Sequence, residues 1–324
     1  CIERDGAGMG IVPCCEAAVA LSQDNEYADS NVKCSGVMVS DRHVLTAAHC
    51  IFAEGHALVS SFGLFAPTTQ TETGKLTAMA TARPFAREGV TPPEQINYEP
   101  LKLPDFYFQP DLVLLKLDRE DAVPTFRVPW LFLGDSITRR EMLAIGYGLN
   151  PNEGEVWTGK RQIVRVGMID EHCPTDWATL ALEEDRTHPT CSDAFECVNS
   201  NVDDLQRVSV EIVMDGGLSP EFVPTLDNSI GVGQATGKKR PDTCVGDSGG
   251  PIYVKDDRNL WAVGAITSRT VVPREGRGGC TGIGSINIRL GAPRVKEWLI
   301  EILTEIEGCE MIEDRAAVRF TGCT

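Results

Sequence analysis

The sequence predicts an all-β protein, and two observations support this. Short apolar runs recur along the chain and are separated by Gly, Pro, Asn and Asp, whereas helical periodicity is scarce. Many short strands with frequent turns are typical of β-sandwiches and β-barrels. The clearest runs are Ser35 to Val39, Asp111 to Leu115, Glu141 to Ile145 and Trp261 to Ile266.

Helical spacing is clearest near the end of the chain, over residues 293–306. Pro293 is suited to the first position of a helix, because its missing N–H has no partner there in any case. A second, weaker helical pattern covers about residues 176–186. The apolar positions of the first helix are Val295, Trp298, Leu299, Ile302, Leu303 and Ile306.

Composition and charge limit the classes of function. The chain has 324 residues, of which 42% are hydrophobic, so it can bury one large or two medium cores. Its formal net charge of −17 argues against binding nucleic acid by phosphate neutralisation. No apolar run approaches the roughly 18 residues of a transmembrane segment. We interpret the opening at Cys1 as a mature or trimmed start.

The cysteine content indicates an oxidising compartment. There are 12 cysteines, an even number, which favours a disulfide framework in a secreted protein, or in the periplasm or on the surface of a bacterium. The alternative is a zinc site, but its spacing fits no common zinc motif, so we expect no metal. Its candidate ligands are His172, Cys173, His188, Cys191 and Cys197.

Three segments contain the residue types of nucleophilic catalysis. His49 lies in Leu45-Thr46-Ala47-Ala48-His49-Cys50, Asp111 opens an apolar run, and Ser248 lies in Gly246-Asp247-Ser248-Gly249-Gly250-Pro251. A serine hydroxyl needs a base to take its proton, and the base needs a third group to orient it. The glycines free the backbone around Ser248, so the N–H groups of Gly246 and Ser248 are candidates for binding an oxyanion.

Other histidines and aspartates lack such a setting. We expect His43 to be a surface residue, although it shares a strand-like segment with His49. No motif surrounds His56, His172 or His188, and none of Asp105, Asp118 and Asp121 opens an apolar strand.

Taken in order, the three segments resemble the trypsin/chymotrypsin family of serine peptidases, as does Ile145-Gly146-Tyr147-Gly148. The resemblance runs from about residue 11 to residue 306. It implies two antiparallel six-stranded β-barrels with the catalytic residues between them. Residues 11–135 would form the N-terminal barrel and residues 136–292 the C-terminal barrel, with an insertion at about 173–230. Residues 293–324 would form a C-terminal helix and a disulfide-bonded tail.

The resemblance also implies the chemistry. The protein would be a secreted endopeptidase in which Ser248 attacks a peptide carbonyl and His49 acts as general base and then acid. Asp111 would complete the triad, Gly246 and Ser248 would form the oxyanion hole, and no cofactor would be needed. A latent or non-catalytic peptidase-like binding protein is the alternative.

Asp242, six positions before Ser248, matches the base of the family's specificity pocket. A buried carboxylate there needs a cationic partner, so the resemblance implies cleavage after Arg or Lys. Ser268 resembles the serine that borders this pocket and Gly282 a glycine of its wall. Arg269 and Thr270 depart from the family pattern, as does the wide gap from Ser268 to Cys280. The expected partners are protein or peptide substrates with basic residues, together with protein inhibitors.

The resemblance implies the disulfides Cys34–Cys50 and Cys244–Cys280, each stabilising by roughly 2 to 4 kcal/mol. Among the other eight cysteines we favour two disulfides, Cys309–Cys323, which would close the tail, and Cys191–Cys197, which would close a local loop. The remaining cysteines would form two bridges, one of them between Cys14 or Cys15 and Cys173. Lipidation of Cys1, a further interpretation, would anchor a bacterial peptidase to a membrane but leave an odd number of cysteines.

The resemblance also implies that activation depends on an ion pair between Ile11 and Asp247. In the family, cleavage frees an Ile-Val amino terminus whose ammonium pairs with the aspartate before the nucleophile. Ile11-Val12 is the best donor, so residues 1–10 would be a pro-segment. Pro13-Cys14 replaces the usual glycines, however, and Met9-Gly10 is no site for a trypsin-like activator. The alternative is that Ile11-Val12 is simply the first strand.

Overall fold

The structure is a computed structural model, and the fold, site and contacts below concern only the residues that it describes. These are residues 2–5, 8–11, 17–22, 32–51, 61–67, 76–84, 112–117, 128–134, 137, 140–149, 162–170, 213–216, 243–270 and 285–323. They are mostly β-structure, so the all-β prediction is confirmed.

A closed six-stranded barrel forms the first half of the fold, in the order β3-β4-β5-β8-β7-β6. All its strand pairs are antiparallel. Apolar side chains such as Val37, Leu45 and Leu114 fill its buried positions. The strands are β3 (Ala18–Ser22), β4 (Val32–Met38), β5 (His43–Thr46), β6 (Phe62–Pro67), β7 (Leu76–Pro84) and β8 (Val113–Leu117).

The second half is a nine-stranded sheet in the order β13-β10-β11-β12-β15-β14-β9-β17-β16, and β13 also pairs with β14. It is larger than the six-stranded barrel that we predicted, because β9 pairs with β14, β17 pairs with β9, and β16 pairs with β17. The strands are β9 (Trp130–Phe132), β10 (Met142–Gly146), β11 (Gln162–Asp170), β12 (Val213–Gly216), β13 (Pro251–Lys255), β14 (Trp261–Thr270), β15 (Ser285–Arg289), β16 (Glu310–Asp314) and β17 (Ala317–Thr321).

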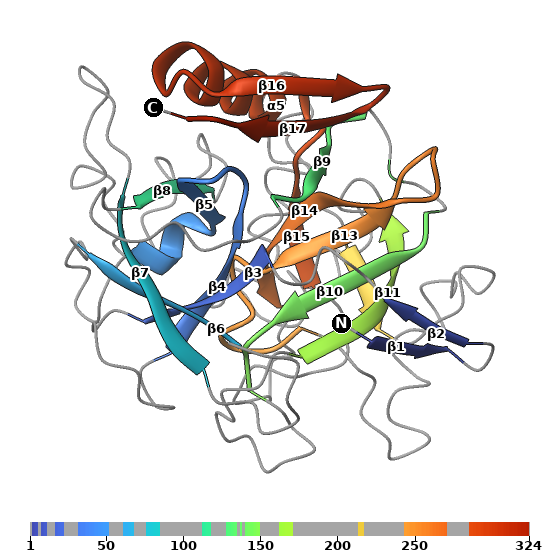
Figure 1. Cartoon of the computed structure of the whole chain (residues 1–324). Helices are drawn as coiled ribbons and strands as arrows, with labels where there is room; N and C mark the ends of the chain where they lie inside the picture. Colours follow the sequence, from blue (N-terminus) through green and yellow to red (C-terminus); the bar gives the residue numbers. More distant parts are fainter. Residues whose placement is uncertain are drawn as a thin grey trace, which may run out of the picture.

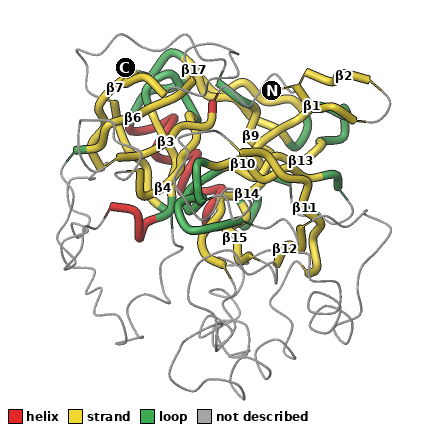
Figure 2. Tube along the Cα trace, turned by 90° about the horizontal axis from the view of Figure 1, so that it is seen from below, coloured by secondary structure: helices red, strands yellow, loops and turns green. Residues whose placement is uncertain are grey.

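The two halves lie side by side in both views of the chain (Figures 1 and 2). The Tyr147 hydroxyl, just after β10, donates to the Ala18 carbonyl oxygen at the start of β3, at 3.0 Å. At the amino terminus, β1 (Ile2–Asp5) and β2 (Gly8–Ile11) form a separate two-stranded sheet.

The helix predicted over 293–306 is present, in two parts. An α-helix, α5 (Pro293–Ile300), continues directly into a π-helix, η5 (Glu301–Ile306). Proline occupies the start of α5, as expected, and Val295, Leu299 and Leu303 are buried, whereas Ile306 is 38% exposed. None of the described helices is long and apolar enough to cross a membrane. The weaker helical pattern at 176–186 lies outside the described residues.

The tail after this helix is a β-hairpin. Strands β16 and β17 pair antiparallel, and Arg315 adopts a φ of 58° in the turn between them. The Cys309–Cys323 disulfide closes the base of the hairpin, which confirms the favoured pairing.

His43 is fully buried, so our expectation of a surface residue was wrong. Its Nε2 lies 3.0 Å from a Glu307 carboxylate oxygen and its Nδ1 lies 2.8 Å from the Ser40 hydroxyl. Lys116 forms an ion pair with the same Glu307 oxygen. The end of the C-terminal helix therefore covers His43, a contact between residues 264 positions apart in the sequence. Of the other three histidines without a motif, none lies within the described residues.

Candidate active site

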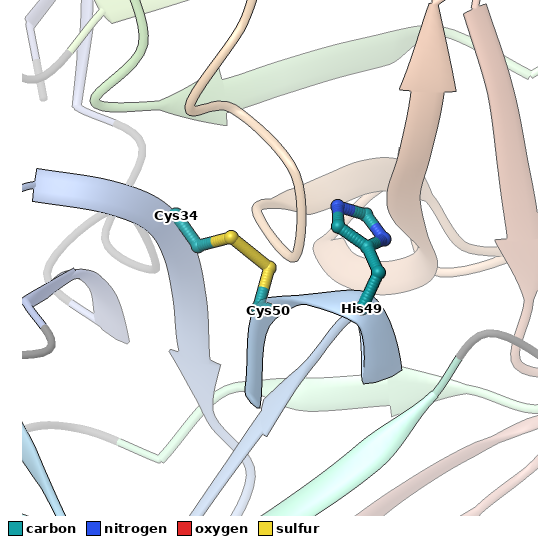
Figure 3. A group of neighbouring side chains, drawn as sticks. All are labelled: Cys34, His49 and Cys50. Atoms are coloured by element: carbon teal, nitrogen blue, oxygen red, sulfur yellow. A yellow bond between two sulfur atoms is a disulfide. The ribbon is translucent and has the colours of Figure 1, made fainter. Parts of the chain in front are cut away.

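His49 lies on a short 3₁₀-helix, Ala48–Ile51, which follows β5 almost directly. The adjacent Cys50 forms a disulfide with Cys34 of β4, the pairing that the family resemblance implied. Figure 3 shows the imidazole beside this disulfide. The bridge thus fixes the segment that carries His49 to the neighbouring strand.

Two groups of described residues have the spacing of metal ligands, but neither can supply thiolates. Potential ligand atoms of Cys34, His49 and Cys50 lie within 4.8 Å of one another, and so do those of His43, Cys309 and Cys323. In both groups the two sulfurs are joined in a disulfide. A metal-binding cysteine needs a free thiolate, so these groups are structural bridges beside a histidine.

Ser248 lies in a tight loop that β14 holds in place. The N–H of Gly249 donates to the Thr267 carbonyl at 2.6 Å, and the N–H of Thr267 donates to Gly250 at 2.9 Å. Gly249 has a φ of 81°, a region that L-residues rarely adopt, and a Cβ there would overlap the Thr46 hydroxyl. Glycine is therefore required where this loop meets the end of β5.

The His49 segment and the Ser248 loop come together through their neighbours. The Ser248 carbonyl oxygen accepts the N–H of Ser35 at 2.7 Å and lies 3.7 Å from the Cys50 sulfur. The Ser248 hydroxyl donates to the Ser268 carbonyl oxygen at 3.1 Å. Within the described residues, no hydrogen bond joins Ser248 to His49.

The Gly246 N–H has a defined direction. The N–H of Leu149 donates to the Val245 carbonyl oxygen at 2.9 Å, and no cis peptide occurs in the described chain. A trans peptide directs its N–H opposite to its carbonyl, so the N–H of Gly246 faces away from Leu149. In the part of the chain described, neither Gly246 nor Ser248 uses its N–H in a hydrogen bond. Both donors therefore lack a partner among the described residues and can bind an acceptor atom.

Asp247 is held by backbone donors. One carboxylate oxygen accepts the N–H of Gly148 and the other that of Cys244, each at 2.7 Å. Burial raises the pKa of Asp247 to about 6, and these two hydrogen bonds only partly oppose it. A Cβ on Gly148 would lie 2.6 Å from the carboxylate, and one on Gly146 would overlap it. The Gly146-Tyr147-Gly148 motif therefore makes room for Asp247.

Ile11 is the last residue of β2, where it pairs with Ile2. In the intact chain its nitrogen is an amide and carries no charge, so Asp247 has no Ile11 ammonium partner in this form. None of the described residues supplies a cation to Asp247.

The structure describes only some of the remaining predicted site residues. Ser268 is buried in β14 and bonds to Ser248 through its backbone, and Cys244 takes part in a disulfide. For Arg269 and Thr270 only the backbone, at the end of β14, is described. Outside the described residues lie Asp111, Asp242, Cys280, Gly282 and the other predicted cysteines, namely Cys1, Cys14, Cys15, Cys173, Cys191 and Cys197.

Sequence reasoning missed Ser35, whose hydroxyl lies between the two halves of the fold. It donates to the Gly246 carbonyl oxygen at 2.8 Å and accepts the N–H of Tyr147 at 3.0 Å. The only signal in the sequence is its place directly after Cys34, which does not predict these contacts.

An all-β fold with a histidine loop tied by a disulfide, next to a Gly-Asp-Ser-Gly-Gly loop, defines the class of trypsin-like folds. A family model described as Trypsin matches residues 15–200, more than half of the chain. The chain therefore belongs to the trypsin family. The matched residues include His49 and Asp111, and Ser248 lies beyond them.

Proposed function

We propose that the protein is a secreted serine endopeptidase with Ser248 as its nucleophile. One observation carries the proposal. The Ser248 hydroxyl belongs to a loop in which the N–H groups of Gly246 and Ser248 have no partner among the described residues, and this loop contacts Cys50, the residue next to His49. Free donors beside a hydroxyl are what acyl transfer needs, because negative charge develops on the substrate oxygen. The disulfides of the chain support secretion.

The reaction proceeds through an acyl-enzyme. Ser248 Oγ adds to the peptide carbonyl carbon while His49 takes its proton, and the carbonyl oxygen becomes an oxyanion between the N–H groups of Gly246 and Ser248. Collapse breaks the C–N bond, and His49 gives the proton to the leaving amine. Water then adds in the same way and releases the acid. Asp111 orients the imidazole and stabilises its charged form.

The bond from Ser248 to Ser268 sets one requirement on this mechanism. The hydroxyl must leave the Ser268 carbonyl and turn toward His49, a rotation about one side-chain bond. Catalytic hydrogen bonds in free enzymes are often long or misaligned and tighten when substrate binds.

We propose that both halves of the fold are β-barrels of the kind found in the trypsin family, with the active site between them. The closed barrel of β3 to β8 supplies His49 and the second half supplies Ser248. The pairing of β13 with both β10 and β14 supports a second barrel of six strands, extended by β9, β17 and β16.

For specificity we propose cleavage after Arg or Lys, through Asp242, Ser268 and Gly282. The support is the position of Asp242, six residues before Ser248, and the buried Ser268. A peptide-library cleavage profile tests this, with the variant Asp242→Ser as its control. Cleavage after basic residues that is lost in the variant supports the proposal, whereas cleavage after apolar residues in both would overturn it.

For activation we propose that a cut after Gly10 frees the Ile11 ammonium to pair with Asp247. The support is a buried carboxylate with a raised pKa and no described cationic partner. Amino-terminal sequencing of the active protein tests this. A start at Ile11 supports it, and full activity with the Gly10–Ile11 bond intact rejects it.

A latent or non-catalytic binding protein is the second candidate, favoured by the hydrogen bond of Ser248 to Ser268 in place of His49. The variant Ser248→Ala separates the two candidates. In an enzyme it lowers the rate of peptide hydrolysis by about 10⁴-fold or more. In a binding protein the wild type and the variant behave alike.

A further inference from the structure

We propose that Ser35 is a positioning residue for the oxyanion hole: its hydroxyl fixes the Gly246–Asp247 peptide and so keeps the Gly246 N–H directed at substrate. This inference rests on the proposed peptidase activity, which gives that N–H its use. Ser35 touches no reacting atom and acts only through the Ser248 loop.

Ser35 lies on β4 and is fully buried, yet its contacts reach the other half of the fold. Its N–H donates to the Ser248 carbonyl oxygen at 2.7 Å and its hydroxyl donates to the Gly246 carbonyl oxygen at 2.8 Å. The hydroxyl also accepts the N–H of Tyr147 at 3.0 Å. These partners are 112 to 213 positions away in the sequence.

The Ser35 residue is itself held in place by the barrel. Its carbonyl oxygen accepts the hydroxyl proton of Thr46 at 2.7 Å, at the end of the strand that leads to His49. The adjacent Cys34 is bonded to Cys50, the neighbour of His49. The position of the Ser35 hydroxyl is therefore fixed by the same elements that position His49.

The Ser35 hydroxyl is needed because Gly246 has no side chain to restrict its backbone conformation. Gly246 has a φ of 94°, and glycine populates such conformations about as readily as ordinary ones. Among the described residues, three hydrogen bonds hold its two peptides: Leu149 N–H to Val245, Ser35 hydroxyl to Gly246, and Asp247 N–H to Cys244 at 2.9 Å. Of the three, only that from Ser35 comes from the other half of the fold.

Loss of the hydroxyl would remove the hydrogen bond that the buried Gly246 carbonyl oxygen accepts, together with the acceptor of the Tyr147 N–H contact at 3.0 Å. An unpaired buried group is costly, so the loop would rotate to find a partner. Rotation about Gly246 moves its N–H away from the oxyanion. The effect falls on the transition state, where the oxyanion forms, and leaves binding of the substrate side chain unchanged.

The matched control is Ser40, which is as fully buried as Ser35 and lies in the same barrel. Its hydroxyl bonds to His43 and to the N–H of Arg42, on the side of the C-terminal helix. Both variants, Ser35→Ala and Ser40→Ala, remove one oxygen from a buried serine. Only the first is expected to disturb the oxyanion hole.

The experiment uses the active protein and expresses kcat per site titrated by a fluorophosphonate, so that unfolded molecules are not counted. We expect Ser35→Ala to lower kcat about tenfold or more with KM unchanged, less than the 10²- to 10³-fold loss of a direct donor. Ser40→Ala should match the wild type. If the wild type takes no label, the proposed function fails; if it is labelled and the two variants behave alike, only the role of Ser35 fails.

A second readout reports on the oxyanion itself. A peptidyl trifluoromethyl ketone with a ¹³C-labelled carbonyl forms a hemiketal on Ser248, and the chemical shift of that carbon against pH gives the pKa of the oxyanion. Ser35→Ala should raise this pKa by about one unit, a tenfold weaker stabilisation. If Ser35→Ala does not fold, Ser35→Thr retains the hydroxyl and should keep the wild-type pKa. An unchanged pKa in Ser35→Ala, or a raised one in Ser35→Thr, overturns the proposal.

Discussion

A carboxylate oxygen of Asp247 accepts the N–H of Gly148 at 2.7 Å, which joins the Ser248 loop to the segment that follows β10. The other oxygen accepts the N–H of Cys244, so both are occupied by neutral donors. Burial without a described cation raises the pKa of Asp247 to about 6. In the uncut protein, burial therefore opposes the charged form of this side chain.

The first prediction concerns the pH dependence of stability in the uncut protein. The pKa of Asp247 in the folded protein lies above its ordinary value of 3.8. The stability that protonation of Asp247 gives to the folded state is therefore fully present below pH 3.8 and is lost as pH rises through about 6. The free energy of unfolding of wild type minus that of Asp247→Asn should therefore fall between pH 4 and 7, by on the order of 2 kcal/mol. Urea unfolding at four pH values measures this. A difference that is flat or rises with pH would contradict it.

The second prediction concerns the space around Asp247. In Gly148→Ala the new methyl group would lie 2.6 Å from the carboxylate and 2.8 Å from the Val245 carbonyl oxygen, so the loop must shift. We expect the kcat per folded molecule to fall at least tenfold, because the Gly246 N–H moves with this loop.

Gly264→Ala is the control for Gly148→Ala. Gly264 lies within β14, and its new methyl would meet the Val254 side chain of β13 at 2.8 Å. This variant should lose stability and keep its kcat per folded molecule. Equal losses of kcat in the two variants would show that the effect is general destabilisation.

Features that depend on residues close together in the sequence could be predicted. The glycines around Ser248 are a local feature, whereas the Cys34–Cys50 pairing was implied by the family resemblance, and the structure gives each a physical role. Pro293 and the apolar spacing after it likewise predicted the helix, because helix periodicity is a local property.

Features that depend on distant contacts could not be predicted. His43 follows a charged turn and resembles a surface residue, yet Glu307 covers it. Ser35 gives no sign of its bonds to Gly246 and Tyr147. The addition of β17 to β9 depends on how the tail folds back, and no spacing along the chain encodes that.

The third prediction concerns His43. Burial lowers its pKa to about 4, with Lys116 adding to the effect while Glu307 and Asp41 oppose it. A lowered pKa means that its stabilising contribution is present above pH 6.5 and is lost as pH falls through 4. The free energy of unfolding of wild type minus that of His43→Gln should fall from pH 7 to 4.5, by up to about 3 kcal/mol. Chemical unfolding at both pH values measures it, and a difference that grows on acidification would contradict it.

The fourth prediction separates the two described disulfides. The bridges Cys34–Cys50 and Cys309–Cys323 span 16 and 14 positions, so loss of either should cost a similar free energy, about 3 kcal/mol. Replacing both cysteines of the first pair by Ala should also lower kcat, because His49 is adjacent to Cys50. Replacing both cysteines of the second pair should leave kcat unchanged. Urea unfolding and peptide hydrolysis on both variants test this, and a loss of kcat in the second would count against it.

The most direct measurement is covalent labelling by a fluorophosphonate, followed by mass spectrometry of the digested protein. If Ser248 is a nucleophile activated by His49, the wild type should carry one label, on Ser248. His49→Ala should be labelled far more slowly and Ser248→Ala not at all. A wild-type protein that is folded, cut before Ile11 and still unlabelled at Ser248 would contradict the assignment of a serine peptidase.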